Sequence, residues 1–169
     1  MKKIAILFIC IIILSFSACG NEQEEFQEPT NFYYCAQDIA YNNISGVIKA
    51  EQREAIQFHG NLASLLRSYL HGPSNPELQM LIPSNVTLIS CAVNENAVTV
   101  TLSEPFSKLT GIKLSTASTA MLMTIYDYAG VDTLCVRAEN ALLDEKDEIV
   151  ITIDDIMLLD SVENGEQYE

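Results

Sequence analysis

The sequence predicts an α+β fold, a single domain with a mixed β-sheet and two helices packed on one face of it. Two segments repeat their apolar residues at the helical spacing of three and four, and the segments around them alternate apolar and polar residues as strands do. Strands come before, between and after the two helices, an order typical of α+β domains. The chain has 169 residues, 49% of them hydrophobic, which suffices for one core and hardly for two.

Two strands are expected to open the folded part. Residues 31–37 are rich in aromatic side chains, which favour strands. After a stretch of turn residues, segment 47–58 is a second β-capable piece, with Ile56 and Phe58 on one side. A helix that begins near Glu51 is the alternative for this second piece.

The first helix is expected to follow Asn61, whose side chain is a suitable N-cap. Gly72 accepts the left-handed backbone that ends a helix, and Pro73 prevents the helix from resuming. The apolar residues at helical spacing lie on one face: Leu62, Leu65, Leu66, Tyr69 and Leu70.

A β-hairpin is expected after the dipeptide Ile82-Pro83. The turn falls at residues 94–96, and the alternation on both sides of it has a period of two. The first strand places four side chains on one side: Thr87, Ile89, Cys91 and Val93. The second strand places three side chains together: Val98, Val100 and Leu102.

The second helix is expected over residues 114–128, after a loop at 103–113. Ser115 or Thr116 is the expected cap, and Gly130 is expected to end the helix. Its apolar face consists of Leu114, Ala117, Met121, Ile125 and Tyr128. We expect this face to pack in the core, and a methionine-rich docking face is the alternative.

Two strands are expected to close the domain. Residues 132–138 alternate as a strand, and a turn at Asn140 follows them. Beyond the charged residues 144–148, a last strand has Ile149, Ile151 and Ile153 on one side. The folded domain is therefore expected over residues 31–159, with an acidic tail at 160–169 that frays.

The first 18 residues have the features of a secretory signal peptide: a basic start, a short apolar run and a small-residue exit. The exit Ser17-Ala18-Cys19 resembles the lipobox of bacterial lipoproteins, although Phe16 stands where that pattern prefers Leu. The resemblance implies that Cys19 carries the lipid, such as palmitate, and anchors the protein on the extracytoplasmic face of the cell membrane. A freely secreted protein and an uncleaved anchor are the alternatives. Residues 19–30 are acidic and without periodicity, and they are expected to form a tether.

The charge of the chain argues against two classes of partner. Removal of the signal peptide leaves seven basic residues against 23 acidic ones, a formal charge of −16. A chain this acidic is repelled by nucleic acid and by anionic lipid headgroups. We therefore expect no nucleic-acid partner.

The sequence offers little that could carry catalysis. It contains no Gly-rich phosphate loop and none of the HExxH, GxSxG or CxxC motifs. Its two histidines, His59 and His71, are expected at opposite ends of the first helix. Three further cysteines lie in predicted strands as buried free thiols, with one disulfide as the alternative: Cys35, Cys91 and Cys135. The acids of residues 144–148 lack the ligand spacing of a calcium loop, so no metal or other cofactor is expected.

An ordered set of short motifs resembles the GerMN domain of sporulation and spore-germination lipoproteins. The resemblance covers residues 30–140, and in two places the chain departs from the family pattern, at Asn140 and at Met123–Ile125. It implies a fold similar to ring-building domains, no enzymatic activity, and contacts with a protein partner or with further copies of the chain. The matching pieces are Phe32-Tyr33-Tyr34, Glu51–Arg53, Gly72-Pro73, Ile82-Pro83, Val98–Ser103, Phe106, Thr124 and the strand around Val136.

The sequence therefore supports two candidate functions. The first is a membrane-anchored lipoprotein with a non-catalytic assembly or adaptor domain, in sporulation or germination. The second is a lipoprotein that presents a groove to a peptidoglycan fragment, a peptide or a small solute. The second function predicts a pocket lined by aromatic side chains with polar groups that converge on it.

Overall fold

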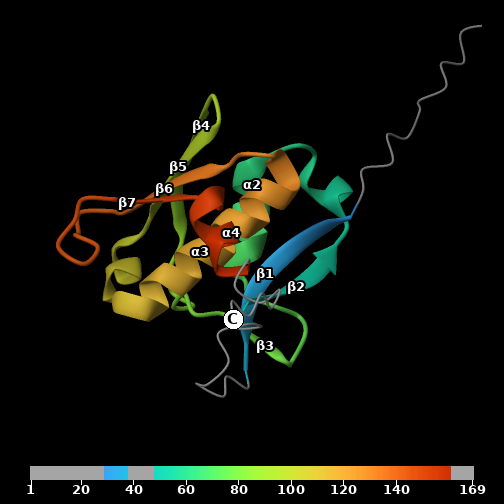
Figure 1. Cartoon of the computed structure of the whole chain (residues 1–169), viewed down its shortest axis with the longest axis horizontal. Coiled ribbons are helices and arrows are strands. Elements are labelled where there is room, and N and C mark those ends of the chain that lie inside the picture. The colour runs from blue at the N-terminus through green and yellow to red at the C-terminus, as the bar shows by residue number, and fades with distance from the viewer. Residues whose placement is uncertain (1–28, 38–47, 161–169) are drawn as a thin grey trace, which may run out of the picture.

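The computed structural model describes residues 29–37 and 48–160, and its strands form two sheets (Figure 1). The expected signal peptide, the lipid site Cys19 and most of the tether lie outside the described residues. So do residues 161–169 of the expected acidic tail. The expected α+β class, with one mixed sheet covered by two helices, is confirmed, and a second and smaller sheet accompanies it.

The larger sheet has the strand order β4-β5-β6-β7. Its strands are β4 (Leu88–Asn94), β5 (Ala97–Leu102), β6 (Thr133–Ala138) and β7 (Ile149–Thr152). The pair β5–β6 is parallel and the two outer pairs are antiparallel, so this sheet is mixed as expected.

The smaller sheet has the order β2-β1-β3. Strand β1 (Thr30–Ala36) lies between β2 (Ile48–Arg53) and the two-residue strand β3 (Leu78–Gln79). Both pairs are antiparallel. The sequence did not predict β3, because two residues are too few for a periodic signal.

Helix α2 (Leu62–Leu70) confirms the first expected helix. The side chain of Asn61 accepts a hydrogen bond from the backbone N–H of Ser64, as an N-cap does. At the other end, Gly72 has a φ of 86°, the left-handed conformation expected for a residue just beyond the helix.

Helix α3 (Gly111–Ala129) begins earlier than the sequence predicted, so the expected caps Ser115 and Thr116 are wrong. The N-cap position is Thr110, whose side chain makes no capping hydrogen bond. The carboxylate of Asp144 accepts the backbone N–H of Gly111 at 2.9 Å instead. A residue 33 positions away therefore accepts a free backbone N–H of the first helical turn. A prediction from local sequence cannot identify such a distant partner. Gly130 ends the helix at a φ of 66°, as expected.

The C-terminal part of the described chain differs from the prediction. The last strand ends at Thr152, and residues Ile153–Asp160 form helix α4, where continued strand and tail were expected. The side chain of Asp155 accepts the backbone N–H of Thr152 at 3.2 Å, and the Thr152 hydroxyl accepts the N–H of Asp155 at 3.4 Å. This reciprocal arrangement is a capping box, which starts a helix.

Short 3₁₀ helices replace two expected segments. Strand β2 stops at Arg53, and Ala55–Phe58 form the 3₁₀ helix η1, so the extended strand through Phe58 was wrong. A second 3₁₀ helix, η2 (Glu104–Lys108), lies in the expected loop before α3. Both segments bury an aromatic ring, Phe58 and Phe106, although their backbones are not strands.

The predicted face of β4 is wrong at Ile89, because the strand contains a bulge. The register shifts between Leu88 and Ser90, so Ile89 does not share the side of Cys91. Leu88 and Cys91 pack against the core, whereas Ile89 is 48% exposed.

The core lies between the larger sheet and helices α2 and α3, which contact the same sheet (Figure 1). Residues of β5 and β6 that point inward are fully buried, and their neighbours on the other face are half-buried or exposed. The buried set from α3 includes Leu114, Ala117, Met121 and Ile125, so the expected core use of this helix is confirmed. Strand β1 lies along the far side of α3 and adds Phe32 and Tyr34 to the same core.

Candidate functional site

The best-formed polar cluster of the described chain joins β2 to the loop after α2. Arg53 forms an ion pair with Glu51 at 2.7 Å, and its guanidinium also donates to the carbonyl of Gly72 at 2.8 Å. The second carboxylate oxygen of Glu51 accepts the backbone N–H groups of Ser74 and Asn75, both at 2.8 Å. The cluster thus brings together two motifs that the sequence resemblance named separately, Glu51–Arg53 and Gly72-Pro73. We call it the Glu51–Arg53 cluster.

The contacts of Glu51 change its proton affinity. Burial alone would raise the pKa of its carboxyl. The N–H of Asn75, the Arg53 guanidinium and the N–H of Ser74 together outweigh burial, so the pKa lies below the ordinary value of 4.5. Glu51 is therefore held as a carboxylate at neutral pH, which suits a structural anchor for the loop.

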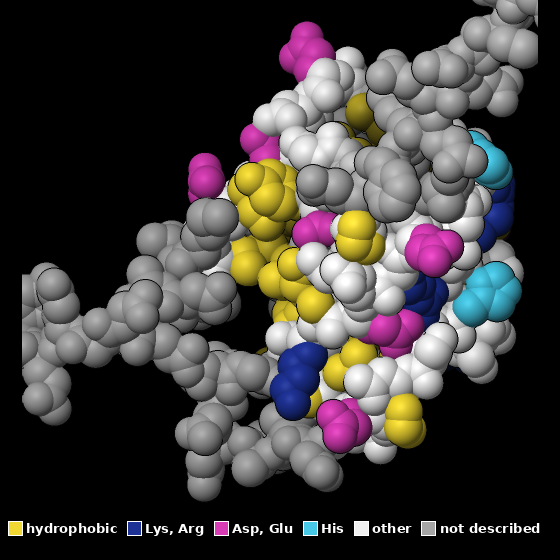
Figure 2. All heavy atoms as spheres, turned by 90° about the vertical axis from the view of Figure 1, so that its right-hand side faces the viewer, with side chains coloured by type: hydrophobic (Ala, Val, Ile, Leu, Met, Phe, Trp, Pro, Cys, Tyr) yellow, Lys and Arg dark blue, Asp and Glu magenta, His cyan; other side chains and the backbone are white. Residues whose placement is uncertain are grey.

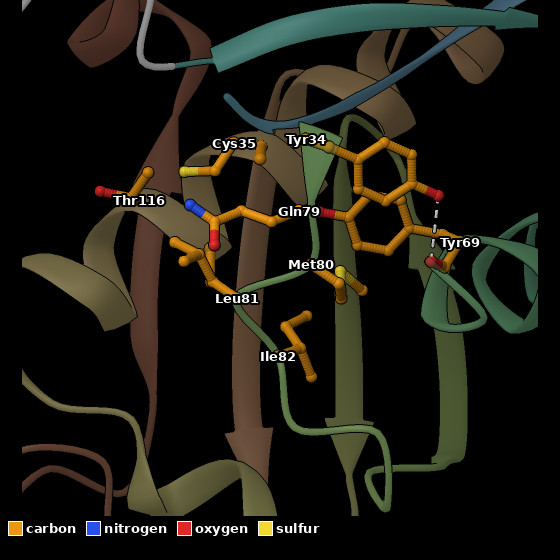
Figure 3. A pocket seen from close by; sticks show the side chains of 10 residues that line it. Tyr34, Cys35, Tyr69, Gln79, Met80, Leu81, Ile82 and Thr116 are labelled. Atoms are coloured by element: carbon orange, nitrogen blue, oxygen red, sulfur yellow. Dashed lines mark hydrogen bonds between the residues drawn. The ribbon is translucent and has the colours of Figure 1, made fainter. Parts of the chain in front are cut away.

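Aromatic rings cover the inner side of this cluster. The Arg53 guanidinium carbon lies 4.4 Å from the centre of the Phe32 ring, a cation–π contact. The rings of Tyr34 and Tyr69 are stacked with centres 5.0 Å apart, and the Tyr34 hydroxyl donates to the carbonyl of Tyr69 (Figure 3). Burial raises the pKa of both phenols well above their ordinary value, so neither phenol ionises near neutral pH.

A small gap lies beside the stacked tyrosines, between β1, β3 and α3 (Figure 3). Cys35, Gln79, Leu81 and Thr116 are among its lining residues, and its volume is about 10 Å³. A gap of this size is at most enough for one water molecule. It is not the aromatic ligand pocket that the second candidate function requires.

A larger and open hollow lies at the C-terminal end of α3, with a volume of about 530 Å³. We call it the α3-end hollow. It is lined by Asp127, Tyr128 and Ala129 of the helix, by the start of β1, and by Ala55 and Gly60. Its one aromatic side chain is Tyr128, which the sequence analysis placed on the apolar face of the second helix. The sequence did not predict any residue of this hollow as a site residue.

Asp127 and Thr124 of α3 hold β1 against the helix. The Asp127 carboxylate accepts the backbone N–H of Asn31 at 2.7 Å, the hydroxyl of Thr30 at 3.0 Å and the side-chain amide of Asn31 at 3.1 Å. The Thr124 hydroxyl accepts the backbone N–H of Tyr33 at 2.9 Å. Strand β3 pairs only with Cys35 and Ala36, and on the rest of this strand edge helix side chains accept the backbone N–H groups of Asn31 and Tyr33.

The two histidines do not form a catalytic pair with each other. Figure 2 shows them as two separate patches on one face, and both are exposed. His59 lies in the turn before α2, whereas His71 caps the other end of α2, as expected. The ring Nδ1 of His71 lies 2.7 Å from the carbonyl of Arg67.

The three thiols of the described chain are free, and their burial differs from the expectation. Cys35 is buried, but Cys91 and Cys135 are only half-buried. Burial raises the pKa of Cys35 and of Cys91, which makes both weaker nucleophiles. Cys91 lies opposite Val100 and Cys135 opposite Thr99, so these two side chains are on opposite faces of the sheet and cannot pair within one domain.

The charged turn at residues 144–148 is solvated, and its acids have structural contacts. Asp144 caps α3, and Glu148 forms an ion pair with Arg137 at 2.5 Å. Within residues 29–37 and 48–160, no group of three or more histidine, cysteine or acidic side chains could hold a metal ion.

The remaining sequence-predicted motif residues lie in the segment between α2 and the hairpin. Ile82 is buried in the core, and the carbonyl of Pro83 accepts the N–H of Val86 at 3.0 Å. A Cβ added to Gly72 would lie 3.5 Å from the Cβ of Met80. Gly72 therefore lies close to Met80, just after β3, and the motifs Gly72-Pro73 and Ile82-Pro83 belong to the same connection.

Residues 31–154 match the family model Germane, described as sporulation and spore germination. Among solved structures, the chain is similar to the tandem GerMN domains of the sporulation protein GerM from Bacillus subtilis, with a TM-score of 0.51 and 18% identity over 74% of this chain and 44% of that one. It is also similar to a candidate lipoprotein from Clostridium perfringens, with a TM-score of 0.48 and 16% identity over 75% of this chain and 90% of that one. No curated protein matches the chain.

Proposed function

Because the chain belongs to the sporulation and spore germination family, we propose that it is a lipid-anchored, extracytoplasmic lipoprotein whose GerMN-like domain works by contact with other proteins. In this role the domain is an assembly or adaptor module in sporulation or germination, and it has no catalytic activity. The sequence resemblance and the family match over residues 31–154 agree on the family.

The observation that carries the proposal is the open edge of β4. This seven-residue strand is the edge of the larger sheet, and the described residues place no strand on its outer side. It contains neither a charged residue nor a proline, two of the devices that prevent an edge from pairing. Its bulge lies at the start of the strand, and residues from Ser90 to Asn94 pair with β5 in regular register. Ile89 and Val93 of this strand are 48% and 55% exposed, so apolar surface accompanies the free backbone groups.

The side-chain chemistry of the described residues also favours contact over turnover. The two histidines are exposed and separate, and the thiols of Cys35 and Cys91 have raised pKa values. The side chains of the Glu51–Arg53 cluster already form hydrogen bonds with the loop after α2. None of these groups combines a nucleophile with a neighbouring base in an accessible place, as covalent catalysis requires.

The anchor is supported by the sequence. The expected signal peptide ends at Ala18, and the described residues begin at Pro29, so an acidic linker of about ten residues, roughly 30 Å when extended, would separate a lipid on Cys19 from the domain. None of the described helices combines the length and apolar character that a membrane span requires. In the proposed arrangement, the attachment to the membrane is a lipid on Cys19.

The second candidate function, ligand binding in a groove, has less support. Its expected pocket would be lined by aromatic rings with convergent polar groups. The gap beside Tyr34 and Tyr69 is too small for a ligand, and the α3-end hollow is lined by a single aromatic ring.

The anchor is tested by detergent phase partitioning of the exported full chain. Cys19→Ala is expected to move the protein to the aqueous phase, while Cys10→Ala, in the apolar run of the signal peptide, is the matched control that leaves it in the detergent phase. Identical aqueous partitioning of the wild type and Cys19→Ala would contradict the lipoprotein assignment.

The assembly role is tested by chemical cross-linking in intact membranes. Val93→Lys places a charge on the open edge of β4 and is expected to remove cross-linked complexes, because a charged edge strand resists pairing. Val150→Lys is the matched control, since Val150 is 54% exposed on the opposite edge strand β7. If cross-linked complexes form with Val93→Lys but not with Val150→Lys, the interface lies at β7, the other edge of the sheet.

A further inference from the structure

The open edge of β4 carries an inference that deepens the proposed function and rests on it. A free edge strand pairs with another strand through those backbone groups that point outward. The neighbouring strand β5 shows which groups these are. On the β4 side, the carbonyl of Thr87 accepts the backbone N–H of Ser103, and on the β6 side the carbonyl of Leu102 accepts the N–H of Glu139. Successive residues of β5 thus face β4 and β6 in turn.

The free backbone groups at the middle of this edge belong to Cys91 and Val93. In an antiparallel pair, the backbone groups of successive residues point to opposite edges of the strand. Since Ser103 faces β4, Thr99 does too, and its partner Ala92 therefore faces β5. Cys91 and Val93, the two neighbours of Ala92, direct their N–H and C=O groups to the open edge.

The strand matches a second copy of itself in one antiparallel register. A hydrogen-bonded pair joins two residues whose backbone groups both point to the partner strand. When Ala92 lies opposite Ala92 of the second copy, Cys91 of each copy lies opposite Val93 of the other. This register uses residues 90–94, so it avoids the bulge before Ser90 and the turn after Asn94.

The same register covers exposed apolar surface. Val93 lies opposite the buried Val98 of β5, so its side chain is on the core side of the sheet, yet it is 55% exposed. Cys91 is on the same side, half-buried against the core. Pairing places Val93 of each copy beside Cys91 of the other, which removes apolar area from water.

The charges near β4 favour the same contact. Two copies of an acidic chain repel each other, but β4 itself contains no charged residue. The exposed Arg67 of α2 lies near Cys91, because its charge partly opposes the burial that raises the pKa of this thiol. Glu95 lies two residues beyond Val93, so in this register it comes within reach of Arg67 of the other copy. Neither of the two ion pairs among the described residues includes Arg67 or Glu95.

We propose that β4 pairs with β4 of a second copy of this chain, antiparallel and centred on Ala92. The two four-stranded sheets then continue across the contact as one sheet. Backbone hydrogen bonds at Cys91 and Val93 hold the pair, and Arg67 of each copy faces Glu95 of the other. The proposed lipid anchors keep both copies on one membrane, which raises their effective concentration.

The proposal is tested by disulfide trapping of the full chain in intact membranes. In the proposed register the two Ala92 residues form a non-hydrogen-bonded pair with Cα atoms about 4.5 Å apart, close enough for a disulfide. Two copies with different peptide tags are expressed together, and each carries Ala92→Cys. Mild oxidation is expected to give a dimer that contains both tags and that a reductant returns to monomers.

Ser90→Cys is the matched control, because Ser90 and Ala92 are both exposed and lie on the same face of β4. In the proposed register the two Ser90 residues lie four positions apart, about 13 Å along the strand, which is beyond the reach of a disulfide. Ser90→Cys is therefore expected to remain monomeric. The wild type is the second control, since its Cys91 lies opposite Val93 and not opposite another thiol.

Charge exchange tests the contact between Arg67 and Glu95. In the Ala92→Cys chain, Arg67→Glu is expected to lower the yield of the trapped dimer about threefold, the effect of an exposed ion pair. Adding Glu95→Arg is expected to restore the yield, because the two charges are then exchanged between the copies. Lys113→Glu, at an exposed residue of α3, makes the same charge change elsewhere and is expected to leave the yield unchanged.

Two results would overturn the proposal. One is that folded Ala92→Cys gives no dimer of the two tags, or forms its disulfide with a different protein. The other is that Ser90→Cys or the wild type is trapped as a dimer as readily as Ala92→Cys. If either result occurs while Val93→Lys still removes the cross-linked complexes, β4 contacts a different protein. The proposed function then stands without this inference, so the two can fail separately.

Discussion

Glu51 and Arg53 connect three parts of the chain that are distant in sequence: β2, the end of α2 and the loop that follows it. Removing the charge of Glu51 leaves the guanidinium of Arg53 without its ion pair and weakens the bonds from Ser74 and Asn75. Glu51→Gln is therefore expected to lower the free energy of unfolding by about 1–3 kcal/mol. Chemical denaturation at pH 7 measures this change, and Glu139→Gln, at an exposed turn residue, is the control.

The same residue gives a pH dependence with a defined sign. The pKa of Glu51 is lower in the folded state than its ordinary value of 4.5. The carboxylate therefore contributes its full stabilisation above pH 4.5 and loses it as the pH falls through the folded value. The difference in unfolding free energy between the wild type and Glu51→Gln should shrink in acid, and a difference that stays constant down to pH 2 would contradict the assigned contacts.

Gly72 is the residue whose backbone conformation sets the direction of the same loop. Its φ of 86° is strained for a residue with a side chain, most of all a β-branched one. Gly72→Val is expected to destabilise the domain by about 1–2 kcal/mol in thermal or chemical unfolding. Ser84→Val, at an exposed residue whose φ is not positive, is the control. An unchanged midpoint for Gly72→Val would show that the left-handed turn is unimportant for stability.

At the scale of elements, the unusual feature is a strand whose edge is satisfied by helix side chains. Thr124 accepts the N–H of Tyr33 and donates to the carbonyl of Ala120 within its own helix. Thr124→Val keeps the shape but leaves the strand N–H without its acceptor, at a cost of about 1–3 kcal/mol. Hydrogen exchange at Tyr33 is expected to accelerate in this variant.

Two further substitutions control the experiment on Thr124. Thr124→Ser keeps the hydroxyl and should retain most of the protection at Tyr33, while Thr119→Val changes a half-buried position of the same helix without a recorded hydrogen bond. Equal exchange rates at Tyr33 in all three variants would show that the Thr124 hydroxyl does not hold β1 against α3.

For the whole molecule, the proposal of function by contact predicts that the reactive side chains are dispensable. Replacement of His59, His71, Cys35, Cys91 and Cys135 together, by residues of similar bulk, is expected to leave function intact once circular dichroism confirms folding. Complementation of a deletion strain measures this outcome, with Val93→Lys as the variant expected to fail. A folded and anchored five-residue variant that fails while Val93→Lys succeeds would require a search for chemistry at those side chains.

The sequence by itself determined most of the periodic structure. Helix α2, the hairpin β4–β5, strand β6 and the end of α3 at Gly130 agree with the prediction, because side-chain periodicity and glycine stops are local signals. The family could also be predicted from the sequence, because the short motifs keep their order along the chain. The start of α4 carried a local signal too, the pair Thr152 and Asp155, which the alternation of isoleucines in β7 masked.

Only the tertiary structure decided the features that join distant segments. The carboxylate of Asp144 sets the start of α3, a bulge turns Ile89 outward, and Asp127 and Thr124 complete the edge of β1. The α3-end hollow has the same origin, since its walls come from the start of β1, from the segment between β2 and α2, and from the C-terminal end of α3. Each of these depends on a hydrogen bond or a contact between residues far apart in the chain. Periodicity records which face of an element is buried, and it does not record which distant group satisfies that element's free backbone atoms.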